Sequence, residues 1–339
     1  MTSTIAQALN TDHVTNLVPI SGEQVASLLD MATCIGLMRS ALMALGTSRA
    51  RQMVRPVLPL NGRTVLGMMP AYDEAAGVAG VKVLTVFPDN YRRGLPSHQG
   101  VIVLFDASTG ALRAIVDAEA ITAIRTAAAS AAATAELANP DAAHLAILGT
   151  GVQARQHLAA LSLVRAFRSV TVWDRQPARA EAFAEQALTE TGLRVIPCTT
   201  VSTATADADV ICTVTAATEP ILVASDVKPG AHINAVGACT PDARELSADL
   251  VAAGRLFVDW RPAALKEAGD ILLAIKDGAV TESHIVGEVG SVMTGDVAGR
   301  TDPNEITIYE SLGQAVQDLI AANHVANALR PDSPRQVTP

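Results

Sequence analysis

The stretch that decides the fold runs from His144 to Ala154 and reads HLAIL followed directly by GTGVQA. Its first five residues are apolar and predict a buried strand, and the next six open a helical pattern. In that setting Gly149 permits a tight turn, Gly151 leaves room for a ligand close to the backbone, and Ala154 lets the helix pack near the strand. Because a helix N-terminus favours negative charge, the stretch predicts a phosphate-binding turn for a dinucleotide.

The choice of dinucleotide depends on the next expected strand, SVTVWD, which ends at Asp174. An acidic side chain at that position accepts hydrogen bonds from the adenosine ribose hydroxyls, which favours NAD. Arg175 follows directly and is suited to the 2′-phosphate of NADP. The sequence therefore predicts NAD or NADP as the cofactor, with NAD favoured.

From about residue 119 onward, helical and apolar strand patterns alternate, which is typical of a parallel sheet covered by helices on both faces. The expected helices are 119–138, 152–166 and 177–192, and the expected strands are 144–148, 169–173, 193–197, 210–214, 232–236 and 256–258. A second glycine series, at Gly287, Gly290, Gly295 and Gly299, follows no expected strand and opens no expected helix. We expect this series to be a loop without chemistry.

The residues before this region predict a different arrangement. Ser21 and Gln24 make a capping box at the start of one expected helix, 22–45. Short β-branched runs follow at 54–60, 64–70, 80–87, 100–106 and 112–117, and turn signals between them predict an antiparallel or mixed sheet. Another amphipathic helix is expected at 308–329. The fold class is therefore α/β with about two domains, as the length of 339 residues also suggests.

Composition excludes several classes of protein. The chain is 49% hydrophobic and 17% charged, which is enough apolar material for folded cores. Its 34 acidic and 25 basic residues give a net charge of −9, and no basic stripe is present, so we expect no nucleic-acid partner. The alanine-rich run Thr126–Ala135 is about half as long as a membrane-spanning helix. It predicts a buried helix and no membrane partner.

The N-terminal segment and the cysteines bear on the compartment. No Lys or Arg occurs before Arg39 and no apolar signal segment follows the start, so we expect a cytoplasmic protein. Cys34, Cys198, Cys212 and Cys239 have no spacing typical of metal ligands, which predicts reduced thiols and no metal site.

Three cations stand in apolar surroundings. Lys82 lies in GVKVLTVF, and it either points to solvent from a half-exposed sheet or faces an anionic ligand. Arg125, in AITAIRTAAASAAATA, either pairs with Asp117 or Glu119 or clamps a carboxylate with two hydrogen bonds. Arg55, in MVRPVLPL, poses the same question. Together with a dinucleotide domain, these cations predict a small substrate that carries a carboxylate.

His98 is the histidine nearest to these strands in sequence, in the turn LPSHQG. It is interpreted either as a structural residue of the loop or as a residue that faces substrate or relays a proton. No Ser/His/Asp order and no HExxH motif is present, so hydrolytic chemistry of those kinds is not expected.

Taken together, these residues resemble the ornithine cyclodeaminase/mu-crystallin family. The matching stretches lie between about residues 50 and 325 and follow the family's order; they are GVKVLTVFPDN, RGLPSHQGVIVLFD, ITAIRTAAASAAAT, LGTGVQARQHL, INAVGACTPDARELSADLV and IYESLGQAVQDLIAA. A resemblance over so many segments is far more specific than the glycine motif alone. It favours a functional role for Lys82 and Arg125.

The resemblance implies a Rossmann domain inserted into a mixed α+β domain. The substrate and dimerisation domain would comprise 1–125 and 305–330, and the Rossmann NAD(P)-binding domain 126–304; the tail 331–339 is expected to be disordered. A homodimer is also implied by the resemblance.

The resemblance also implies the roles of individual residues. Arg55, Lys82 and Arg125 would bind the substrate carboxylate, with His98 as a further candidate for substrate binding. The implied cofactor contacts are Gly149, Thr150, Gly151, Val152, Gln153, Ala154, Asp174, Arg175, Thr213, Val214, Thr215, Ala216, Val236, Gly237, Ser311 and Gly313.

One departure from the family pattern concerns Cys239, within NAVGACTP. Enzymes of this family that cyclise ornithine carry an aspartate at this position, whereas a thiol is a poor partner for an ammonium group and a different acid–base group. Cys239 either packs in a tight loop or faces substrate as a weak proton donor. In both cases the departure argues against ornithine cyclisation.

We therefore expect an NAD(P)H-dependent oxidoreductase that acts on C–N bonds and takes a small carboxylate-bearing imine or amino acid. The expected activity is a ketimine reductase of proline metabolism that converts Δ1-pyrroline-2-carboxylate to L-proline, with Lys82, Arg125 and Cys239 as catalytic candidates. The alternatives are ornithine cyclodeaminase, an amino-acid dehydrogenase similar to alanine dehydrogenase, and a crystallin-like binding protein without turnover.

Overall fold

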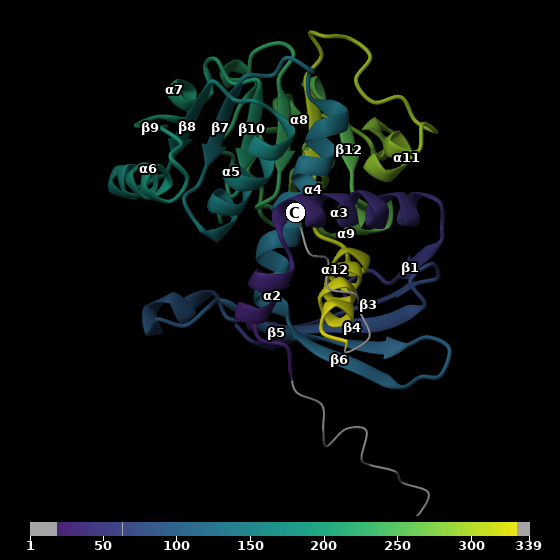
Figure 1. Ribbon diagram of the computed structural model, residues 1–339. Coiled ribbons are helices and arrows are strands. Elements are labelled where there is room, and N and C mark those ends of the chain that lie inside the picture. Colours follow the sequence, from purple (N-terminus) through teal and green to yellow (C-terminus); the bar gives the residue numbers. More distant parts are fainter. Residues whose placement is uncertain (1–18, 63, 331–339) are drawn as a thin grey trace, which may run out of the picture. The chain divides into compact units, whose positions relative to one another are not determined.

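The computed structural model describes residues 19–62 and 64–330 and divides them into two compact units (Figure 1). Unit 1 contains residues 19–30, 49–122 and 318–330, and unit 2 contains residues 31–48 and 123–317. The expected tail 331–339 lies outside the described residues. Unit 1 is thus built from three separate segments of the chain.

Unit 1 is organised around a six-stranded sheet in which all neighbouring strands are antiparallel. The strand order is β1-β3-β4-β5-β6, and β2 also pairs with β3. The strands are β1 (Ala50–Gln52), β2 (Val57–Asn61), β3 (Thr64–Asp73), β4 (Val78–Val86), β5 (His98–Asp106) and β6 (Leu112–Asp117), with a 3-10 helix η1 (Pro88–Arg93) between β4 and β5.

The register of this sheet places Lys82 on its buried face. Lys82 of β4 lies between Met69 of β3 and Ile102 of β5, and Val116 of β6 continues the row. All four side chains are buried, and Lys82 retains only 5% of its exposure. The expectation that Lys82 points to solvent is therefore wrong.

The helix expected at 22–45 is two helices, α2 (Gly22–Leu28) and α3 (Met31–Gly46). The capping box is confirmed, because Ser21 accepts from the Gln24 N–H while the Gln24 side chain accepts from the Ser21 N–H. The helical pattern hides the break at Leu29, whose backbone turns to φ −121° and ψ 87° while its side chain stays buried.

Unit 2 contains an eight-stranded parallel sheet with the order β13-β12-β14-β11-β10-β7-β8-β9. Its strands are β7 (His144–Leu148), β8 (Ser169–Trp173), β9 (Val195–Cys198), β10 (Val210–Thr213), β11 (His232–Ala235), β12 (Arg255–Val258), β13 (Ile285–Glu288) and β14 (Thr307–Glu310). The chain runs from β7 outward to β9 and then returns to place β10 beside β7. Ligands bind at such a reversal, outside the carboxyl ends of the strands.

Helices cover both faces of this parallel sheet. They include α4 (Ala118–Leu137), α5 (Val152–Val164), α6 (Pro177–Thr191), α7 (Val201–Thr205), α8 (Ala248–Ala253), α9 (Arg261–Glu267), α10 (Gly269–Lys276) and α11 (Val289–Met293), with 3-10 helices η2 (Ala224–Asp226) and η3 (Glu282–His284). The last helix, α12 (Ala315–Ala328), belongs to unit 1 from Asp318 onward. Figure 1 shows α5 in front of the strands of unit 2, and its Leu158 and Leu161 pack with Leu145 and Ile147 of β7. The expected doubly covered α/β sheet is confirmed.

The alanine-rich stretch of α4 is buried in unit 2, as expected for a core helix. Ala127, Ala131 and Ala133 are fully inaccessible, and their small side chains let this helix approach its neighbours closely. Within the described residues no single helix is both long and apolar enough to cross a membrane, although α2 and α3 pass that test when taken together as a bent pair.

The segment after residue 304 differs from the expectation. The expected helix 308–329 begins only at Ala315, because residues Thr307–Glu310 form β14, which pairs with β11 and β12. Gly313, at φ +76°, stands in the turn between this strand and α12. Residues 305–317 therefore belong to unit 2, and only the residues from Asp318 onward join unit 1.

The second glycine series is also not a simple loop. Gly287 lies in β13 and Gly290 in α11. A Cβ on Gly290 would lie 2.0 Å from the carbonyl oxygen of Leu42, so this glycine lets α11 pack directly against the backbone of α3. The prediction of a loop failed here because a four-residue strand and a five-residue helix carry too little periodic signal.

Candidate functional site

The glycine turn of unit 2 has the geometry that a dinucleotide requires. Gly149 follows β7 at φ +116°, and a Cβ there would lie 2.8 Å from the Val214 carbonyl oxygen. Gly151 is the N-cap of α5, and nothing lies within 4 Å of its Cβ position. Ala154 is fully buried beneath the helix. The turn thus leaves open space in front of a helix N-terminus, where a pyrophosphate group fits.

Asp174 lies directly after β8 and beside this turn. Its Oδ2 accepts from the Thr150 hydroxyl at 2.7 Å, and its Oδ1 accepts from the Gln176 N–H at 2.9 Å. Arg175 is exposed, as is Val152 at the first position of α5, while Gln153 is half-buried. The structure therefore brings Thr150 and Asp174 together, at the place where a carboxylate meets an adenosine ribose.

The loops after β10 and β11 meet at the same edge of the sheet. Thr213 and Val236 are buried, Val214 is half-buried, Ala216 is exposed, and a Cβ on Gly237 would lie 2.2 Å from the Thr215 carbonyl oxygen. Since Val214 also approaches Gly149, the three loops after β7, β10 and β11 form one continuous surface of backbone groups. The implied cofactor residues of these loops lie together.

The loop after β14 joins this edge. The Ser311 N–H donates to the Ala235 carbonyl oxygen at 2.8 Å, and the N–H groups of Leu312 and Gly313 both donate to Asp259 Oδ2 at 2.9 Å. Burial raises the pKa of Asp259 to about 6, although its hydrogen bonds from Gln314 and the backbone oppose the shift. Asp259 therefore fixes the turn that carries Gly313.

Cys239 lies between the loops after β11 and β14. Its thiol donates to the Val236 carbonyl oxygen at 3.2 Å and stands 4.0 Å from the carbonyl oxygens of Ser311 and Leu312. The side chain is half-buried. These contacts place the thiol at the ligand-binding edge of unit 2 and leave both of its expected roles open.

Arg125 is buried in unit 2 with only 4% exposure. Its Nη1 donates to Gln317 Oε1 at 3.3 Å, and a Cβ on Gly313 would lie 2.4 Å from the same nitrogen. Glycine at 313 is therefore required twice, for the positive φ and for the close approach of the guanidinium. The guanidinium has a fixed position, as a carboxylate clamp requires.

Lys82 has two polar contacts within unit 1. Its Nζ donates to the Thr122 hydroxyl at 2.6 Å and forms an ion pair with Asp318 Oδ1 at 3.2 Å. Both charged side chains are at least 95% buried. An ammonium group so well desolvated interacts strongly with any further anion that reaches it.

Arg55 and His98 lie in unit 1 with Lys82. Arg55 is half-buried ahead of β2, and His98 is exposed at the first position of β5. The protein around its ring and the positive charges of Lys82 and Arg55 lower the pKa of His98 below its usual value. The lowered pKa disfavours the protonated form of His98 beside Lys82 and Arg55.

The structure adds residues that the sequence patterns did not single out. They are the direct partners of the expected site residues, namely Thr122, Asp318, Gln317, Asp259 and Glu245. A signal existed for two of them. Asp259 follows an apolar strand of a parallel sheet, where ligand-binding groups gather, and Asp318 is the single charged residue in the run AVQDLIAA.

Comparison with known proteins agrees with this geometry. The chain belongs to the ornithine cyclodeaminase/mu-crystallin family, whose model matches residues 18–332. It is 45% identical over 275 residues to the ketimine reductase mu-crystallin of Mus musculus, covering 81% of this chain and 84% of the relative. The resemblance inferred from the sequence is thereby confirmed.

Two solved structures are also similar. One is Δ1-pyrroline-2-carboxylate reductase of Thermococcus litoralis in complex with NADH and L-proline, with a TM-score of 0.89, 34% identity and coverage of 92% of this chain and 98% of that one. The other is an archaeal alanine dehydrogenase dimer with bound NAD, with a TM-score of 0.87, 29% identity and coverage of 92% and 96%.

The two glycines of the turn give a direct test of the phosphate site. We expect Gly151→Ala to keep the thermal unfolding midpoint of the wild type and to weaken NADH binding about tenfold or more, because its Cβ fills only the space that the pyrophosphate needs. Gly149→Ala is expected to lower both the unfolding midpoint and the affinity for NADH. The residue has φ +116°, and its new Cβ would lie 2.8 Å from the Val214 carbonyl oxygen. Fluorescence titration and calorimetry measure the two effects. Unchanged NADH affinity in Gly151→Ala would contradict the assignment.

Proposed function

We propose that the chain is an NAD(P)H-dependent ketimine reductase that converts Δ1-pyrroline-2-carboxylate to L-proline. The observation that carries the proposal is the pair of buried cations, Lys82 of unit 1 and Arg125 of unit 2, in a chain whose unit 2 also holds a dinucleotide turn. The substrates and products named for the mu-crystallin and pyrroline-2-carboxylate reductase relatives support the same chemistry.

Substrate binding is assigned to the three cations. Lys82, Arg125 and Arg55 bind the carboxylate, with the guanidinium of Arg125 making two parallel hydrogen bonds and the ammonium of Lys82 acting as a point charge. Thr122 and Asp318 hold the Lys82 ammonium in place, and Gln317 holds the guanidinium of Arg125, for which Gly313 leaves room. Because these groups are fixed before the substrate arrives, binding costs little reorganisation.

The proposed reaction requires little acid–base chemistry from the side chains of the protein. NAD(P)H, when bound, supplies a hydride, which forms the new C–H bond at the imine carbon. The protonated imine nitrogen takes up the electron pair of the C=N bond and becomes the amine of proline. The residues contribute orientation and charge, and the buried cations keep the carboxylate in place as the positive charge of the iminium disappears.

Cys239 separates this proposal from ornithine cyclisation. Its thiol donates to the Val236 carbonyl oxygen and offers no carboxylate to the side-chain ammonium of ornithine. The proposed cofactor is NADH, since Asp174 lies beside the turn and Arg175 is exposed. The proposed compartment is the cytoplasm, in keeping with four cysteines, all in the described residues, that carry no disulfide.

The assay follows oxidation of NADH and NADPH at 340 nm with Δ1-pyrroline-2-carboxylate, beside ammonia release from L-ornithine with catalytic NAD. We expect turnover of the imine, faster with NADH, and no ammonia. Ammonia and proline formed from ornithine in equal amounts would overturn the assignment of Cys239. The absence of activity in both assays would contradict the proposed function.

In the same assay Arg125→Lys is expected to lower kcat/KM for the imine about hundredfold, mainly through KM, because a lysine cannot replace two fixed hydrogen bonds to one carboxylate. NADH affinity should stay within about twofold of the wild type. As a matched control, Arg194→Lys changes an exposed arginine of unit 2 with no role in the site and should leave KM for the imine unchanged. Equal imine KM in wild type and Arg125→Lys would remove Arg125 from the site.

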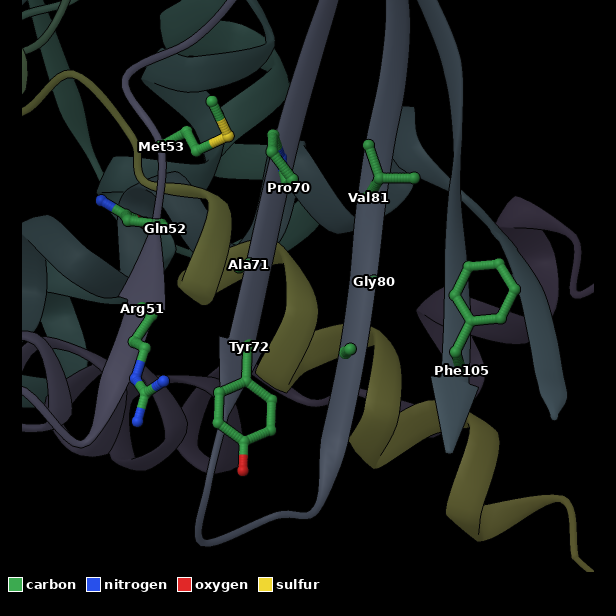
Figure 2. A pocket seen from close by; sticks show the side chains of 10 residues that line it. Arg51, Gln52, Met53, Pro70, Ala71, Tyr72, Gly80, Val81 and Phe105 are labelled. Carbon is green, nitrogen blue, oxygen red and sulfur yellow. The ribbon is translucent and has the colours of Figure 1, made fainter. Parts of the chain in front are cut away.

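We also propose that the chain forms a homodimer in which a second copy of this chain covers one face of the unit 1 sheet. The face of the unit 1 sheet opposite Lys82 is apolar, and a shallow hollow of about 480 Å³ opens on it between β1, β3, β4 and β5. Figure 2 shows Tyr72, Val81 and Phe105 pointing from this face, with α12 behind the sheet. Met68 and Val101 of the same face are 43% and 40% exposed. The dimer of the alanine dehydrogenase neighbour supports a homodimer here.

A charge on this face should separate the two copies. Val101→Glu is expected to convert the dimer to a monomer, because an unpaired buried charge costs about 3 kcal/mol or more at an interface. Leu188→Glu, at an exposed leucine of α6, is the matched control and should leave the mass unchanged. Sedimentation velocity measures both. A Val101→Glu dimer of wild-type stability would place the interface elsewhere.

A further inference from the structure

Glu245 is a fully buried carboxylate at the ligand-binding edge of the parallel sheet. Its Oε1 accepts from the Thr215 N–H at 2.7 Å and from the Thr215 hydroxyl at 2.6 Å. Its Oε2 accepts from the Gly237 N–H at 2.7 Å. One carboxylate therefore joins the loop after β10 to the loop after β11.

The backbone of Glu245 is itself held by a second buried carboxyl group. Asp270 Oδ1 accepts from the N–H groups of Glu245 and Leu246 at 2.8 and 2.7 Å. The Glu245 carbonyl oxygen accepts from the N–H groups of Ile221 and Leu222 at 2.8 and 3.1 Å. Glu245 thus has little freedom to move, and whatever it contacts is fixed with it.

The arrangement has an electrostatic cost. Burial raises the pKa of Glu245. Burial also raises the pKa of Asp270 to about 7, and the nearby charge of Glu245 adds to this shift. Burial and the carboxylates of Asp270, Asp259 and Glu245 raise the pKa of Glu310 well above its usual value. Four acidic groups gathered in the interior of unit 2 oppose folding, and groups retained at such a cost are commonly functional.

The contact between the loops leaves no room for adjustment. A Cβ on Gly237 would lie 2.2 Å from the Thr215 carbonyl oxygen and 2.5 Å from Glu245 Oε2. Three donors from two loops meet the two oxygens of one side chain. An amide at 245 would set its own N–H group against one of these donors, so only a carboxylate satisfies all three.

We propose that Glu245 is a positioning residue for hydride transfer, which fixes the loops after β10 and β11 in the single arrangement that binds NADH. The inference rests on the proposed function, in that both loops contact the cofactor. Glu245 acts through Thr215 and Gly237 and touches neither substrate nor the reacting atoms. Its loss lets the two loops move apart and affects NADH before it affects the imine.

The test begins with Glu245→Gln in the full chain and measures NADH affinity by fluorescence titration. We expect the dissociation constant to rise about tenfold or more, as for loss of a hydrogen bond to a charged acceptor. The imine KM at saturating NADH should stay within about twofold of the wild type, a split that general unfolding does not produce. Glu282→Gln, at an exposed glutamate of η3 in the same unit, is the matched control and should bind NADH normally.

A second pair of variants keeps the test valid if Glu245→Gln fails to fold. Thr215→Val removes the hydroxyl that donates to Glu245 at nearly constant volume, and Thr215→Ser restores it. We expect weaker NADH binding in the first and recovery in the second. NADH affinity equal to the wild type in both Glu245→Gln and Thr215→Val would overturn the inference. A wild-type chain that binds no NADH would instead refute the proposed function.

Discussion

A buried ammonium group needs a counter-charge, and the ion pair between Lys82 and Asp318, at 3.2 Å, supplies it inside unit 1. The two residues are 236 positions apart in sequence. The chain must therefore leave unit 1 after β6, build the whole parallel sheet of unit 2, and return through α12 to complete the environment of Lys82. The return of residues 318–330 to unit 1 agrees with this requirement.

In unit 2, buried negative charges fix neighbouring polar groups in a similar way. Asp259 and Glu245 are buried carboxylates whose oxygens accept backbone N–H groups from the loops that bear the expected cofactor residues. In both units a buried carboxylate fixes a group that is a candidate for ligand binding. Fixed polar groups in a desolvated setting are effective because they need no rearrangement when the reaction occurs.

Local sequence patterns predicted much of the fold because most elements carry their own signal. The expected bounds of β6, β7 and β8 agree with the structure to the residue, and the glycine turn from Gly149 to Ala154 lies where the motif placed it. The failures concern segments whose structure depends on distant partners. Leu29 breaks a helical pattern because its side chain stays in a core, and β14 forms where two parallel strands accept it.

The site shows the same division. Lys82, Arg125 and the expected cofactor loops, whose roles stay predictions, were singled out, since a cation in an apolar run or a glycine after a strand is visible locally. Their partners Asp318, Gln317 and Glu245 were not, because an ion pair or a loop brace joins residues that periodicity cannot connect. Such second partners decide whether a charged side chain is a solvated surface group or a preorganised binding group.

The central claim is that the buried cations recognise the carboxylate of a cyclic imine. The most direct measurement compares kcat/KM of the wild-type protein for Δ1-pyrroline-2-carboxylate with that for Δ1-pyrroline, which has the same ring and imine but no carboxylate. We predict that kcat/KM is about a thousandfold or more higher for the imine with the carboxylate. The imine without it leaves Lys82 and Arg125 without an anionic substrate group to bind. Similar values for the two imines would contradict it.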